Sequence, residues 1–124
     1  MKYLIDTHIF IWWSVGNIRL SKKAIAVLLN STNEIYVSAV TAWEIELKQI
    51  KGSLKLSRTF EDYFIPSGFE ELPVRFSHTA VLKKLPSIHK DPFDRLLIAQ
   101  AKSEKLTLIT ADPKIRKYPV KILF

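Results

Sequence analysis

Apolar residues follow two patterns along the chain, short continuous runs and longer segments with helical spacing. The short runs are rich in β-branched and aromatic residues and are bounded by polar residues, a pattern that predicts strands buried on both faces of a sheet. A weaker run at 71–74 predicts one more strand. The other predicted strands are 3–5 (YLI), 35–37 (IYV), 107–110 (TLIT) and 120–124 (VKILF).

The segments between these runs carry apolar residues at intervals of three and four, which is typical of amphipathic helices. Ser21 and Ser77 each precede such a segment and are predicted N-caps. A short helix after Ser57 is predicted to break at Pro66-Ser67-Gly68. The remaining predicted helices cover 7–15, 20–30, 38–52, 77–85 and 91–106.

Two of these helices have more specific predictions. The helix at 91–106 has Asp91 as N-cap and Pro92 as its first residue, and its apolar residues nearly surround the axis, as in a buried central helix. The helix at 38–52 is predicted to stop at Gly52. Its predicted buried face consists of Val40, Trp43, Leu47 and Ile50.

Strands that alternate with helices, and that are apolar on both faces, predict an α/β fold with a parallel sheet covered by helices on each side. The 124 residues fit one domain of ordinary size, so residues 1–124 are expected to form a single domain. With 48% hydrophobic and 25% charged residues, the composition is that of a soluble globular protein.

Composition and charge limit the kinds of functional site, location and partner that the chain could have. Cysteine is absent, which excludes disulfides, thiolate catalysis and cysteine-ligated zinc. Asp6 and His8 interrupt the first apolar run, and no run is long enough to span a bilayer, so a cytoplasmic location is expected. Nineteen Lys and Arg against twelve Asp and Glu give a net charge of +7, which favours a polyanion such as nucleic acid as partner.

Four carboxylates hold informative positions. Asp6 follows the first strand, Glu44 lies in the helix after the second, Asp94 lies at the start of the 91–106 helix, and Asp112 follows the 107–110 strand. In an open α/β sheet, ligands bind beyond the carboxyl ends of the strands. If the four acids converge there, their oxygens would suit a hard divalent cation such as Mg²⁺ or Mn²⁺.

Each acid also fits a role at a helix start. Asp6 and Asp112 have the positions of N-caps, and Asp94 in a first turn favours the helix dipole. Thr41 with Glu44 matches a capping box. On residue types and spacing alone, capping and metal binding both remain open.

The segments LIDTH, SAVTAWEIELK, DPFDRLLIAQA and LITAD occur in the order and at the separation seen in PIN-domain ribonucleases. The chain resembles in particular the VapC toxins of bacterial and archaeal toxin–antitoxin pairs, over essentially its whole length. Matched by position, the four acids of the PIN family fall on Asp6, Glu44, Asp94 and Asp112.

The resemblance implies a fold and a function. The implied fold is a PIN-like domain with a parallel sheet of order 3-2-1-4-5, and the implied activity is Mg²⁺- or Mn²⁺-dependent hydrolysis of RNA. It further implies a homodimer and inhibition by a VapB-type antitoxin. Asp6, Glu44 and Asp94 would be the main metal ligands, and Asp112 would bind directly or through water.

Several neighbours of these acids have two possible roles. Thr7 and Thr110 would hold ligands or water, or simply end strands, and Asp91 would cap its helix or support the site. Arg95 would contact phosphate, pair with a ligand or be solvated.

Lys48, Lys51 and Lys55 would follow an RNA backbone or form a solvated helix face. Surface or packing roles are expected for His8 and His89, and core or dimer-interface roles for Trp12 and Trp13.

Two other classes of protein compete with a nuclease. A phosphorylation-receiver domain has similar length and alternation and also binds Mg²⁺. It needs an acidic pair after its first strand, however, whereas Asp6 stands alone, and no Asp follows 71–74. A PIN-like module that binds RNA or protein without catalysis is the other alternative, and the presence of all four acids argues against it.

Overall fold

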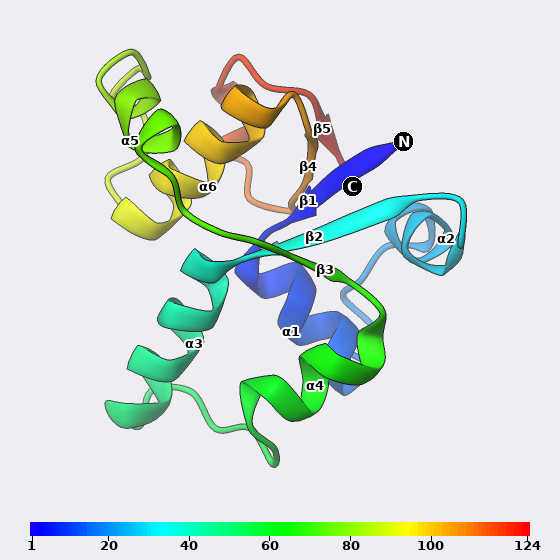
Figure 1. Cartoon of the computed structure of the whole chain (residues 1–124). Coiled ribbons are helices and arrows are strands. Elements are labelled where there is room, and N and C mark those ends of the chain that lie inside the picture. The colour runs from blue at the N-terminus through cyan, green and yellow to red at the C-terminus, as the bar shows by residue number, and fades with distance from the viewer.

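The computed structural model describes residues 1–124 and contains one five-stranded parallel sheet (Figure 1). The strand order is β3-β2-β1-β4-β5, which confirms the α/β class and the order 3-2-1-4-5. All four strand pairs are parallel. The strands are β1 (Lys2–Ile5), β2 (Glu34–Ser38), β3 (Glu70–Leu72), β4 (Thr107–Ile109) and β5 (Ile122–Leu123).

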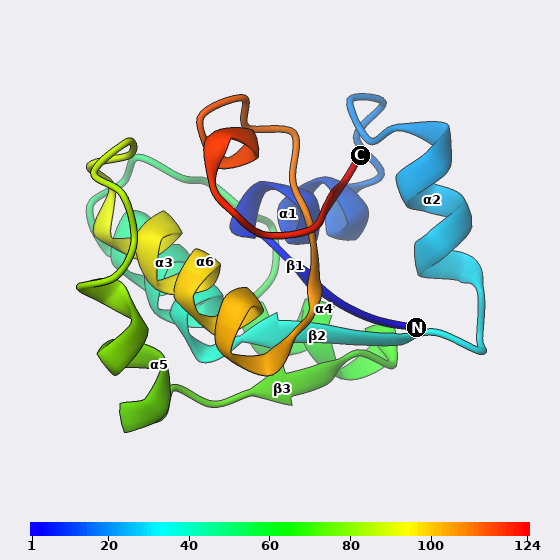
Figure 2. The same ribbon diagram turned by 90° about the horizontal axis from the view of Figure 1, so that it is seen from above.

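Helices connect the strands and cover both faces of the sheet, and none is long and apolar enough to cross a membrane (Figure 1). Helices α3 and α6 pack against each other, as the view from above shows (Figure 2). The helices are α1 (Thr7–Val15), α2 (Lys22–Leu29), α3 (Ala39–Ile50), α4 (Phe60–Ser67), α5 (Phe76–Leu82), α6 (Pro92–Glu104) and the 3₁₀ turn η1 (Ile115–Lys117).

The core consists of two clusters, one on each face of the sheet. In β1, Leu4 points into the cluster formed with α5 and α6, whereas Tyr3 and Ile5 point into the cluster formed with α1 and α2. This alternation is what a strand buried on both faces requires. Trp12 and Trp13 are half-buried against the second cluster, so both contribute to packing within the chain.

Helix α3 buries a different face from the one predicted. Val40 is buried, but Trp43 is 59% and Ile50 is 81% exposed. The buried face instead includes Thr41, Glu44 and Ile45. Helix α3 contacts both core clusters, one through Val40 and the other through Ile45. The face that it buries is therefore set by its place between the two clusters, and not by hydrophobicity alone.

Three predicted boundaries are also wrong, and one of them is the start of β5, which begins at Ile122 and not at residue 120. Strand β3 ends at Leu72 because Pro73 follows it and cannot donate a ladder hydrogen bond. Helix α5 begins after Arg75, so Ser77 is not its N-cap. The ring of His78 accepts a hydrogen bond from the Arg75 backbone N–H at 3.0 Å and completes this helix start. The N-caps predicted at Ser21 and Asp91 are confirmed.

Candidate metal centre

Asp6 lies where β1 passes into α1, and the residue is 3% exposed. One carboxylate oxygen accepts a hydrogen bond from the Ile9 backbone N–H at 2.9 Å, so Asp6 is the N-cap of α1. The other oxygen accepts a hydrogen bond from the hydroxyl of Thr110, which follows β4. Capping of α1 therefore accounts for the hydrogen bond of only one carboxylate oxygen of Asp6. The second oxygen faces the carboxyl ends of the strands.

Glu44 is buried in the middle of α3, and its side chain does not cap the helix. The N-cap is Ser38, and Thr41 bonds the hydroxyl of Thr7 at 3.1 Å, so the predicted capping box is wrong. Glu44 Oε2 accepts a hydrogen bond from Lys48 Nζ at 2.6 Å. Its Oε1 is buried without any partner. An unpaired buried carboxylate oxygen is costly, and a bound cation would remove this cost.

Asp94 and Asp112 are bridged by a histidine. His89 Nε2 lies 2.9 Å from Asp94 Oδ2 and 3.1 Å from Asp112 Oδ2. The Asp91 backbone N–H donates to His89 Nδ1 at 3.2 Å, so the proton of a neutral ring is at Nε2, directed at the two acids. The structure thus corrects the surface or packing role predicted for His89. Only its nearness in sequence to Asp94 could have indicated this.

The electrostatics show that the acids share one environment. Burial raises the pKa of Asp94 to about 7, and the charges of Asp91, Glu44 and Asp6 contribute to this rise. His89 opposes the rise. The pKa of Asp94 therefore depends on an acid at the start of its own helix and on acids from two other segments of the chain.

Asp6 shows the same effect. Burial is the main reason that its pKa is raised, and the charge of Asp112 adds to it. Hydrogen bonds from Thr110 and Ile9, and the nearby His8, act in the opposite direction. The fold has brought together four carboxylates that are mutually repulsive when ionised.

This set of donors fits a hard divalent cation. The four acids offer only oxygen, one of these oxygens is buried without a partner, and the charges of neighbouring acids help to raise the pKa of Asp6 and of Asp94. The side chains of His89, Asp94 and Asp112 each place a ligand atom within 4.8 Å of the others. Mg²⁺ and Mn²⁺ prefer such carboxylate sites.

Of the supporting residues, Thr110 lies in this cluster. Its hydroxyl donates to Asp6 and accepts from the Asp112 backbone N–H at 3.1 Å, and thereby links two of the acids. Thr7 bonds Thr41 and no acid. Asp91 caps α6 by accepting hydrogen bonds from the backbone N–H groups of Phe93 and Asp94.

Comparison with known proteins identifies the family. A family model for the PIN domain matches residues 3–121. The chain belongs to the PIN domain family. It is 28% identical over 120 residues to ribonuclease VapC22 of Mycobacterium tuberculosis, an alignment that covers 93% of this chain and 90% of that protein.

Solved structures share the fold of this PIN domain. The chain matches VapBC2 from Rickettsia felis, bound to a promoter DNA fragment, with a TM-score of 0.74 at 19% identity, covering 99% of this chain and 98% of the other. It matches a toxin–antitoxin complex from Klebsiella pneumoniae with a TM-score of 0.68 at 21% identity, covering 98% and 96%. At these identities the likeness establishes the architecture.

The topology of the PIN domain also decides against a receiver domain. Receivers have the flavodoxin-like strand order 2-1-3-4-5. Here β1 lies between β2 and β4, and β3 is an edge strand. The receiver alternative is therefore wrong.

The side chain of Arg95 in this PIN domain forms hydrogen bonds that the sequence did not indicate. Its guanidinium donates hydrogen bonds to the carbonyl oxygens of Pro86 at 2.9 Å and Leu82 at 3.2 Å. It also donates to the Tyr118 hydroxyl at 3.1 Å, and this hydroxyl accepts from the His89 backbone N–H. Arg95 forms no ion pair with an acid, and it fastens the segment that carries His89.

Replacing Arg95 with alanine should lower the free energy of unfolding by roughly 2 kcal/mol, because charged hydrogen bonds to several acceptors are lost. Chemical denaturation measures this change. The matched control is Arg116→Ala, since Arg116 is exposed on η1 and its side chain forms no hydrogen bond. Equal losses in the two variants would contradict the fastening role.

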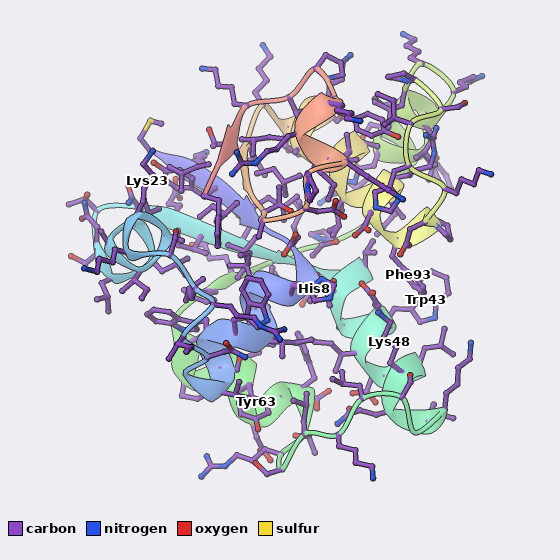
Figure 3. The ribbon with its side chains drawn as sticks, turned by 180° about the vertical axis from the view of Figure 1, so that it is seen from behind. His8, Lys23, Trp43, Lys48, Tyr63 and Phe93 are labelled. Atoms are coloured by element: carbon purple, nitrogen blue, oxygen red, sulfur yellow. The ribbon has the colours of Figure 1, made fainter.

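The lysines predicted to bind RNA differ from one another. Lys48 is paired with Glu44, whereas Lys51 and Lys55 are exposed and form no ion pair. Figure 3 shows Lys48 on α3 and, nearby, the contact between Trp43 and Phe93, whose ring centroids are 4.8 Å apart. Lys48 thus pairs with an acid of the cluster in this structure, and RNA binding by Lys48 and Lys51 stays a prediction.

Proposed function

We propose that this PIN domain is a Mg²⁺- or Mn²⁺-dependent endoribonuclease and the toxin of a VapBC-type pair, acting in the cytoplasm. The observation that carries the proposal is the cluster of Asp6, Glu44, Asp94 and Asp112, in which Asp6 and Glu44 are buried and one Glu44 oxygen has no partner. Membership of the PIN family and similarity to a ribonuclease support it. The proposed partners are RNA, a VapB-type antitoxin and a second copy of the chain.

In this proposal Asp6, Glu44 and Asp94 hold the cation, and Asp112 holds it directly or through water. A bound cation would supply Lewis-acid chemistry at this site, making an attacking water more acidic and offsetting charge on the scissile phosphate and the leaving oxygen. Thr110 and His89 position the carboxylates by hydrogen bonds. Hydrolysis forms a bond from the water oxygen to phosphorus, breaks the bond to the leaving oxygen and transfers a proton to that oxygen.

The purified chain should cleave single-stranded RNA with Mg²⁺ or Mn²⁺ and should be inactive with EDTA. Expression should arrest growth, and co-expression of an antitoxin encoded beside it should restore growth. Gel analysis of RNA and growth curves measure these outcomes. A chain that binds RNA and Mn²⁺ without cutting, and that leaves growth unchanged, would instead support the non-catalytic binding module.

A further inference from the structure

A cavity of about 300 Å³ lies directly beside the acid cluster. It is formed by the start of α1, the connection from α1 to α2, and the segment after β4. Two of the candidate metal ligands form part of its wall, so whatever occupies it lies next to the candidate metal centre. Its lining residues are Asp6, His8, Trp12, Arg19, Ala111 and Asp112.

One wall of this cavity is aromatic. His8 and Trp12 are four residues apart on α1, on the same face of the helix, with ring centroids 6.2 Å apart. Trp12 is half-buried and packs against Phe124 at 6.3 Å, which holds its indole in place. His8 is exposed and lies close enough to Asp6 to lower the pKa of that carboxyl. The aromatic wall therefore begins beside the acids.

The same cavity contains a free guanidinium. Arg19 is exposed, and its side chain forms no hydrogen bond and no ion pair, although Asp6 and Asp112 line the same cavity. Its backbone N–H donates to the Asn17 side chain at 2.8 Å, which orders the connection that carries it. Because its guanidinium is unpaired and the connection that carries it is ordered, Arg19 is well suited to bind a phosphate group.

We propose that this cavity is a subsite for one nucleotide of single-stranded RNA, with its base against His8 and Trp12 and its phosphate on Arg19. The inference rests on the proposed ribonuclease function. Asp6 and Asp112 disfavour a simple anion in this cavity, so the aromatic contact must contribute to binding. A base can stack in this way only when it is unpaired, which favours single-stranded RNA over a duplex.

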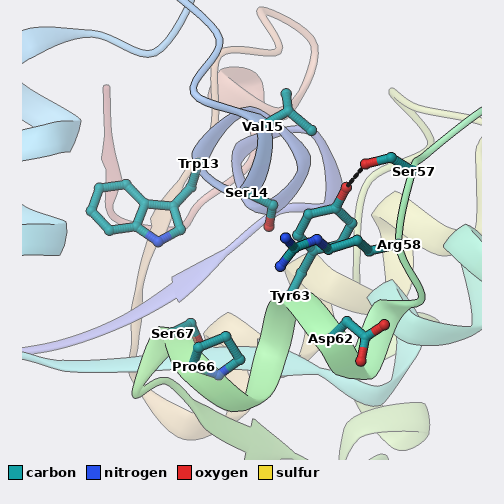
Figure 4. A pocket seen from close by; sticks show the side chains of 9 residues that line it. All are labelled: Trp13, Ser14, Val15, Ser57, Arg58, Asp62, Tyr63, Pro66 and Ser67. Atoms are coloured by element: carbon teal, nitrogen blue, oxygen red, sulfur yellow. Dashed lines mark hydrogen bonds between the residues drawn. The ribbon is translucent and has the colours of Figure 1, made fainter.

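A larger cavity elsewhere provides a matched control. It measures about 570 Å³, lies between α1 and α4 and contains Arg58 beside Tyr63, with Trp13 further along (Figure 4). None of the four site acids lines it. Arg58 is exposed and unpaired, as Arg19 is. Arg58→Ala therefore changes the net charge by the same amount as Arg19→Ala, but in a cavity that none of the four site acids lines.

The experiment measures binding of a short fluorescein-labelled single-stranded RNA, by anisotropy and over a range of salt concentrations. An Asp94→Asn background prevents cleavage without changing a lining residue of the subsite. Arg19→Ala should weaken binding about tenfold and reduce the slope of log K against log salt by about 0.7, the value for one phosphate contact. Arg58→Ala should leave both quantities near those of the parent.

The aromatic wall is tested in the same assay. Trp12→Leu retains an apolar side chain for packing and should weaken binding about tenfold, whereas Trp12→Phe should bind nearly as the parent does. His8→Ala, at an exposed position, tests the wall even if Trp12→Leu fails to fold. Melting temperatures identify variants that have lost structure.

The outcomes separate the subsite from the proposed function. Normal RNA cleavage by the wild-type chain, together with parental binding by Arg19→Ala and His8→Ala, would overturn the subsite alone. Equal weakening by Arg19→Ala and Arg58→Ala would show a general charge effect and would also overturn it. A wild-type chain that cleaves no RNA would overturn the proposed function and the subsite with it.

Discussion

Replacing Asp6 with asparagine should reduce RNA cleavage by at least about a hundredfold and leave the melting temperature unchanged or raised. Loss of a group that supports a metal ligand typically costs 10- to 100-fold, and loss of a ligand should cost more. Asparagine caps a helix as well as aspartate does, so the bond from Ile9 survives. The substitution also removes a buried charge, whose cost is seen in the raised pKa of Asp6.

Cleavage assays and thermal melting of the purified variant measure both effects. Asp62→Asn is the matched control, because Asp62 is exposed in the first turn of α4 and lies outside the acid cluster. This control should cleave RNA at the wild-type rate. An Asp6→Asn protein that remains active but melts at a lower temperature would favour capping as the sole role of Asp6.

Without divalent cations, the contribution of Asp94 to stability should fall as the pH rises from about 4 to about 7. The pKa of Asp94 is 3.8 in the reference state and about 7 when folded, so the folded state binds the proton more tightly. Asp94 therefore adds stability below pH 4, and this contribution is lost as the pH approaches 7. Because the carboxyl is partly solvated, we expect a loss on the order of 2 kcal/mol.

Urea denaturation in EDTA at several pH values measures this loss, and comparison with Asp94→Asn isolates the part due to Asp94. The variant should show a flatter dependence on pH across this interval. Added Mg²⁺ should stabilise the wild type most at pH 7 and above, where the acids are ionised and free to bind it. Parallel curves for wild type and variant would contradict the assigned environment of Asp94.

Much of the fold follows from the sequence because the responsible forces are local or periodic. Continuous apolar runs at 3–5 and 35–37 predict strands buried on both faces, and the structure has them. Caps such as Ser21 and Asp91 act on backbone groups two or three residues away, so neighbouring residues suffice to predict them.

The convergence of the acids depends on the tertiary structure. Resemblance to the PIN family matched the positions of Asp6, Glu44, Asp94 and Asp112, but only the parallel sheet brings their segments to one edge. Whether an acid caps a helix or joins a cluster depends on what its second oxygen contacts. For Asp6 that contact is Thr110, 104 residues away in the chain.

Sequence alone determined that this chain is a basic α/β protein with acids after its strands, because composition, periodicity and caps are properties of neighbouring residues. Only the tertiary structure decided that α3 turns Glu44 inward and Trp43 outward. It also decided that His89 bridges two acids and that Arg95 fastens the segment carrying His89. These roles depend on partners distant in sequence, which are set by the packing of α3 and α6 against the sheet.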